Sequence, residues 1–195
     1  MNKGRKSPRL KVVCEGDAYI ISGRMLSQAT SLRSAAEMLN QARNKPAEGK
    51  SQEDFLAAFH GVPILQAQSA EIALKALWRI GHNKELGEPP RCHNLTRLHD
   101  NLTETIQMQL AERFPEIPDP SCPHFPIPYR KGLRAILNDH EIALEEWRYA
   151  YELGSLRFEH VFDDVLNTLI ELGWQLHNQW LTRLRDGGAQ DPGPQ

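Results

Sequence analysis

Charged side chains stand at regular intervals on a segment that otherwise has the composition of a buried helix. Glu71 and Lys75 are four residues apart, with the glutamate first, which is the favourable order for an ion pair on one helix face. His93 follows after a loop rich in glycine and proline, and Arg148 and Tyr149 lie on a later segment. A guanidinium group such as that of Arg148 can bridge two elements by bidentate bonding to a carboxylate. We therefore expect these five residues to gather in a polar seam between helices.

The polar seam has two interpretations, and the sequence leaves both open. Buried polar networks often do no more than fix the register of packed helices. On a helix surface, the pair of Glu71 and Lys75 would contribute only about 0.3–0.5 kcal/mol. The functional interpretation is that Glu71, Lys75, His93, Arg148 and Tyr149 bind a partner protein, an RNA or a nucleotide.

Arg134 and His140 form the one candidate catalytic pair. Cleavage of RNA without a metal needs a base for the 2′-hydroxyl proton and a cation near the phosphate, and these two side chains suit those tasks. Six helical steps of about 100° place them about 120° apart, so that His140 falls on an apolar stripe and Arg134 on a polar one. This favours a packed or interfacial histidine. A metal-independent endoribonuclease using Arg134 and His140 is the enzymatic alternative.

Metal, cofactor and disulfide chemistry find little support in the sequence. Cys14, Cys92 and Cys122 are widely spaced, and no CxxC pair occurs. His93 lacks the companion ligands that a closed metal site needs. A phosphate-binding glycine loop is also missing. We expect no metal and no cofactor, and a reducing, cytoplasmic setting.

Overall charge gives no sign of a nucleic-acid-binding field. The 195 residues carry a formal net charge of −2, with 25% charged residues. Basic residues are concentrated before Glu15, which predicts a flexible basic arm over residues 1–16. No apolar run is long enough to span a bilayer, so no membrane association is expected.

Hydrophobic periodicity predicts the elements that would position these side chains. Apolar residues recur at three- and four-residue steps in five segments, and turn residues separate the segments. The predicted helices span residues 17–44, 51–80, 95–114, 131–153 and 155–185. Gly61 and Pro63 predict a kink or break in the second. Six prolines predict an extended segment that crosses the bundle at 115–130, and residues 187–195 should be disordered. The sequence thus predicts one all-α domain over 17–186, an antiparallel bundle of about five helices.

Several of these residues resemble a known family. Ala70-Glu71-Ile72-Ala73-Leu74-Lys75-Ala76-Leu77, the glycine stop at Gly81, the Pro-rich loop and His93-Asn94-Leu95 resemble the pattern of HEPN domains, as do Trp147-Arg148-Tyr149 and Tyr151-Glu152. The resemblance covers about residues 17–185. It implies an antiparallel four-helix core, frequent homodimerisation, and a link to RNA or nucleotides in prokaryotic defence and toxin–antitoxin systems.

HEPN proteins follow two functional branches, and the resemblance allows either. Some are metal-independent endoribonucleases that use an Arg, four to six residues, then a His. Arg134 and His140 match that spacing, although Ala135 stands where the family usually has a polar residue. Others lack the pair and act as partners of nucleotidyltransferases or as binding modules. We expect this chain to be a non-catalytic, dimeric module of the second kind that binds along the polar seam.

Overall fold

The computed structural model describes residues 15–44, 52–82, 87–118, 128–140 and 161–187, and every structural statement below concerns those ranges. The described helices are α1 (Glu15–Asn44), α2 (Gln52–Gly81), α3 (Leu95–Asp100), α4 (Glu104–Arg113), α5 (Leu133–Asp139) and α8 (Phe162–Gly187). Two short strands, β1 (Ile117–Pro118) and β2 (Pro128–Arg130), pair antiparallel. The fold is therefore an all-α bundle, as the periodicity predicts. Across the described ranges, no helix has both the length and the apolar character to cross a membrane.

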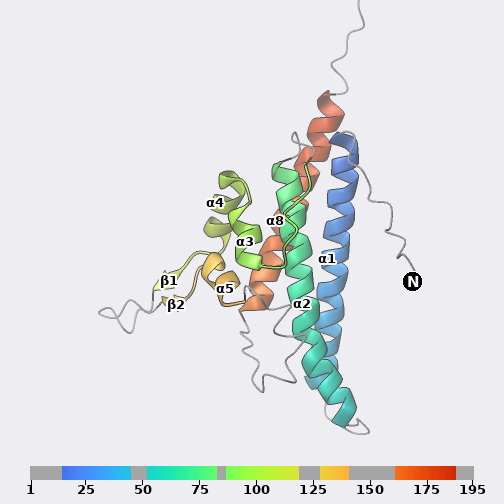
Figure 1. Ribbon diagram of the computed structural model, residues 1–195, viewed down its shortest axis with the longest axis vertical. Helices are drawn as coiled ribbons and strands as arrows, with labels where there is room; N and C mark the ends of the chain where they lie inside the picture. The colour runs from blue at the N-terminus through green and yellow to red at the C-terminus, as the bar shows by residue number, and fades with distance from the viewer. Residues whose placement is uncertain (1–14, 45–51, 83–86, 119–127, 141–160, 188–195) are drawn as a thin grey trace, which may run out of the picture.

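Three long helices form the body of the bundle. In Figure 1, α1, α2 and α8 lie side by side, and α1 runs opposite to the other two. Ser69 of α2 donates its hydroxyl to the carbonyl of Ala29 in α1 at 2.7 Å, and Trp174 of α8 donates to Thr30 at 3.3 Å. The three short helices pack together on the side of α2 and α8 that faces away from α1 (Figure 1).

Apolar residues at helical spacing explain why these elements associate. The main core joins Leu74 and Leu77 of α2, Leu98 of α3, and Leu166 and Leu169 of α8, all of them at most 1% exposed. Ala29 of α1 and Ala70 and Ala73 of α2 belong to the same core, and their small side chains let the two helices approach closely. A second cluster surrounds the buried Trp180, near the N-terminal end of α1 and the C-terminal ends of α2 and α8.

The predicted breaks differ from the observed ones in two helices. α2 continues through Pro63 as one helix, so of the predicted kink or break at Gly61 and Pro63 the break is wrong. A proline within a helix loses one backbone hydrogen bond, and the extensive packing of α2 against α1 offsets that loss. The predicted single helix over 95–114 is instead two helices, because Asn101 ends α3 and Thr103 begins α4 in an extended conformation.

The region after α4 also differs from the prediction. The prolines predict an extended segment that crosses the bundle, but Ile117 pairs with Arg130, so the two ends of this segment lie side by side. Prolines fit such a two-stranded ribbon, since an edge strand need not donate every N–H group. The helix predicted from 131 is described only as α5, which ends at His140 in a non-helical conformation. Residues 141–160, and with them the start predicted for the last helix, lie outside the described residues, as do the basic arm up to residue 14 and the tail from 188.

Candidate functional site

A buried glutamate organises the part of the polar seam that the structure describes. Glu71 is 7% exposed and lies on α2. One of its carboxylate oxygens accepts from Lys75 Nζ at 2.5 Å, and the other lies 3.0 Å from His93 Nδ1. The structure therefore brings together three of the five predicted seam residues, although His93 lies 22 positions after Glu71 in the chain.

Local interactions hold His93 in reach of α2. Asn94 caps α3 by accepting from the backbone N–H of Arg97 at 2.7 Å, which fixes the chain directly after His93. Upstream, the side chain of Arg79 in α2 donates to the carbonyl of Gly87 at 3.3 Å. The loop is thus attached to α2 before it reaches His93, and to α3 immediately after it.

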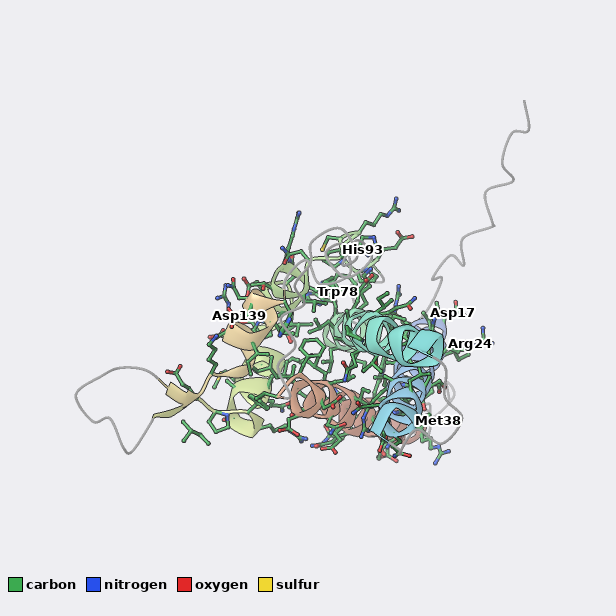
Figure 2. The ribbon with its side chains drawn as sticks, turned by 90° about the horizontal axis from the view of Figure 1, so that it is seen from below. Asp17, Arg24, Met38, Trp78, His93 and Asp139 are labelled. Carbon is green, nitrogen blue, oxygen red and sulfur yellow. The ribbon has the colours of Figure 1, made fainter. Side chains whose placement is uncertain are left out.

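The seam opens onto a surface that carries exposed arginines. The side chain of His93 is 63% exposed, although its Nδ1 atom bonds to a buried carboxylate. Arg91 and Arg97 flank it in sequence and are both exposed, with Arg91 paired to Glu88 at 2.7 Å. Figure 2 shows His93 at an outer edge of the molecule. The geometry suits an anionic ligand that approaches from solvent and meets His93 first.

Arg148 and Tyr149 lie outside the described residues, so their predicted place in the polar seam stays a prediction. Within the described residues, Glu71 bonds to Lys75 and to His93.

Arg134 and His140 occupy different environments. His140 is 4% exposed, and its ring meets Phe162 edge-on at 4.9 Å between centroids. Arg134 is exposed and makes two hydrogen bonds to the carboxylate of Asp100, both of 2.8 Å. The structure places His140 in the packing against α8 and Arg134 on the surface of α5, so the two do not share one cavity.

Arg134 belongs instead to a network that the sequence did not indicate. Asp100 also lies 3.2 Å from Nδ1 of the buried His99. The hydrogen bond from Arg134 lowers the pKa of Asp100, and burial lowers the pKa of His99. His99 and Arg134 border a cavity of about 640 Å³ between α4 and α5. No local pattern could reveal this network, because Arg134 follows Asp100 by 34 residues.

A second buried histidine was also missed. Ser22 of α1 lies 3.2 Å from Nδ1 of His177 in α8, and Tyr19 stacks on the His177 ring at 4.0 Å. Burial lowers the pKa of His177. Ser22 donates its single hydroxyl proton to the carbonyl of Tyr19 at 2.8 Å, so it is not a nucleophile with His177 as its base, and the buried pair joins two helices.

The described residues offer no cluster of three or more His, Cys, Asp or Glu side chains that could hold a metal ion. Comparison of the chain with models of known families, with curated proteins and with solved structures finds no match.

Proposed function

We propose that this protein is a non-catalytic binding module that holds RNA, or a nucleotide, on the polar seam. The observation that carries the proposal is the contrast between Glu71 and His93: a nearly fully buried carboxylate orients a histidine that is largely exposed. A network that served only to fix helix register would have no reason to present its histidine to solvent. Imidazole and ammonium groups beside exposed arginines are well suited to phosphate oxygens.

The HEPN resemblance supports the same assignment and extends it. It suggests a homodimer, a prokaryotic defence or toxin–antitoxin setting, and a nucleotidyltransferase as a possible protein partner. A purely structural partner of such an enzyme is the alternative in which the polar seam binds no ligand. A metal-independent endoribonuclease that uses Arg134 and His140 is the catalytic alternative.

A binding titration with matched arginine variants tests the proposal. Fluorescently labelled single-stranded RNA is titrated with the full chain at several salt concentrations, and anisotropy reports binding. Arg97→Gln should weaken binding roughly three- to tenfold and reduce the salt slope by about one, because one phosphate contact is lost. Arg24→Gln removes the same charge from an exposed position on α1, away from His93 in Figure 2, and should change little.

Other outcomes decide between the alternatives. Equal losses for Arg97→Gln and Arg24→Gln would mean diffuse attraction rather than a site on the polar seam. RNA cleavage in the presence of a chelator, abolished by His140→Ala in a folded protein, would establish the endoribonuclease. Under our proposal His140→Ala leaves binding unchanged and costs roughly 1–3 kcal/mol of stability, because it removes buried packing against Phe162.

A further inference from the structure

A second, partly open cavity lies at the surface of the three-helix body, apart from the polar seam. It has a volume of about 320 Å³, and its polar lining comes from all three long helices. α1 contributes Arg33, Glu37 and Asn40, α2 contributes Gln66, and α8 contributes Asp163 and Asn167. In Figure 2, Met38, which follows Glu37 in the chain, lies on the opposite side of the molecule from His93.

Three side-chain oxygens at this cavity have no hydrogen-bond partner. They are Asn40 Oδ1, Gln66 Oε1 and Asn167 Oδ1, and all three atoms are buried. A buried acceptor without a partner costs about 1–3 kcal/mol, so such atoms are rare in folded proteins and call for an explanation. Three of them around one cavity indicate that a ligand with several N–H donors supplies the missing bonds.

The orientation of Gln66 follows from its partner. Its Nε2 atom donates a hydrogen bond to Asp163 Oδ1, and a carboxylate can only accept. The amide of Gln66 therefore cannot be turned round to satisfy its own oxygen, and Gln66 is 2% exposed, so bulk water does not reach it. The hydrogen bond to Asp163 therefore fixes which end of the amide is the oxygen, while small rotations of the amide remain open.

The charge of the lining favours a cation. Glu37 and Asp163 contribute two negative charges and Arg33 one positive charge, a formal sum of −1. Asp163 lies in the first turn of α8, where the helix dipole stabilises a carboxylate. The cavity is also far larger than a bare metal ion, and its volume lies at the lower end of the range for small-molecule pockets.

We propose that this cavity binds the ammonium group of a small organic amine. A primary ammonium has three N–H donors and no acceptor, which matches three unpaired amide oxygens with Asp163 as counter-charge. Amide torsions have broad energy wells, so each oxygen can turn toward the cavity at little cost. A divalent cation takes six or more oxygen ligands, whereas Arg33 offsets one of the two carboxylates here, and the formal sum of −1 matches a single ammonium group.

Calorimetric titration of the full chain tests the proposal with putrescine as the probe. Putrescine should bind the wild-type chain, and Asp163→Asn should weaken binding about tenfold or more, because the counter-charge of the ammonium is lost. Asp164→Asn is the matched control, since this exposed neighbour in the same helical turn does not line the cavity. Tetramethylammonium has the same charge per ammonium group but no N–H donor, and it should not bind.

Asn40→Leu provides a second readout that does not depend on the folding of Asp163→Asn. It removes an unpaired acceptor, so the unliganded protein should unfold at a higher temperature while its affinity for putrescine falls. The proposal is overturned if putrescine fails to bind, if Asp163→Asn and Asp164→Asn behave alike, or if Mg²⁺ or Ca²⁺ binds there in place of amines. Because the polar seam is not involved, none of these results bears on RNA binding.

Discussion

Three buried ionisable residues form hydrogen bonds that connect parts of the fold. Glu71, His99 and His177 are each at least nine-tenths buried, and each has a partner on another segment or a neighbouring residue. Burial of an ionisable group is costly unless hydrogen bonds compensate it. The spacing and chemistry of Glu71, Lys75 and His93 predict from sequence alone that they belong to the polar seam. The sequence could not indicate His99 or His177, since a histidine within an apolar stripe is typical of ordinary packing.

Removal of the Glu71 carboxylate should destabilise the fold. Glu71→Ala should cost about 1–3 kcal/mol, because it leaves Lys75 partly buried without its counter-charge and removes the bond to His93. Glu88→Ala breaks the exposed pair with Arg91 and should cost less than about 1 kcal/mol. Chemical denaturation measures both values, and equal costs would show that Glu71 is not an organising group.

The buried histidines predict how stability depends on pH. Burial lowers the pKa values of His177 and His99 below their ordinary value of 6.5, so at and below that pH the unfolded chain binds more protons than the folded one. The free energy of unfolding should therefore be highest above pH 6.5 and fall as the pH drops through 6.5 toward the lowered values.

The variant His177→Gln should make this dependence weaker. Urea denaturation at pH 7.5 and pH 5.5 gives the loss of stability for each protein, and the loss should be smaller in the variant. An identical loss in both proteins would mean that the protonation of His177 does not oppose folding.

At the scale of the elements, close contacts between helices determine how the three long helices pack. A Cβ atom added to Gly173 of α8 would lie 2.5 Å from Leu26 Cδ2, and Leu26 is fully buried in α1. A Cβ atom added to Gly61 of α2 would lie 3.4 Å from Leu39 Cδ1, an ordinary contact. The contact between α8 and α1 therefore excludes a methyl group at Gly173, whereas the contact between α2 and α1 has room for one at Gly61.

Two glycine substitutions test this difference. Gly173→Ala should destabilise the protein by roughly 1–2 kcal/mol, because overpacking against Leu26 exceeds the gain in helix propensity. Gly61→Ala should be neutral or stabilise it by up to about 1 kcal/mol, since the propensity gain is not opposed. Thermal unfolding compares the two, and stabilisation by Gly173→Ala would contradict the close α1–α8 contact.

Sequence periodicity was sufficient for the existence of the helices but not for their ends. α1 and the buried face of α8 follow directly from apolar residues at three- and four-residue steps. The division between α3 and α4 depends on how Asn101 and Thr103 bond to the backbone, and periodicity does not contain that information. The local preference of proline predicts a break at Pro63, but packing of α2 against its neighbours keeps the helix continuous there.

At the scale of the whole molecule, the polar seam depends on how α2 and the loop before α3 meet. Glu71 and Lys75 are placed by the helix alone, whereas His93 reaches them only because the loop is attached at Gly87 and Asn94. The contact between Glu71 and His93 could not be derived from either segment alone. The cavity lined by Gln66 and Asp163 likewise forms only where three helices meet, so no sequence motif could predict it.

One measurement locates the RNA on this surface directly. RNA that contains 4-thiouridine is cross-linked by light to the wild-type chain, which is then digested with trypsin and analysed by mass spectrometry. Our account predicts cross-links in the peptide of residues 92–97, which contains His93. Because the peptide of residues 135–148 contains both His140 and the seam residue Arg148, fragment spectra must locate the cross-linked residue within it, and cross-links confined to His140 would contradict our account and favour the endoribonuclease.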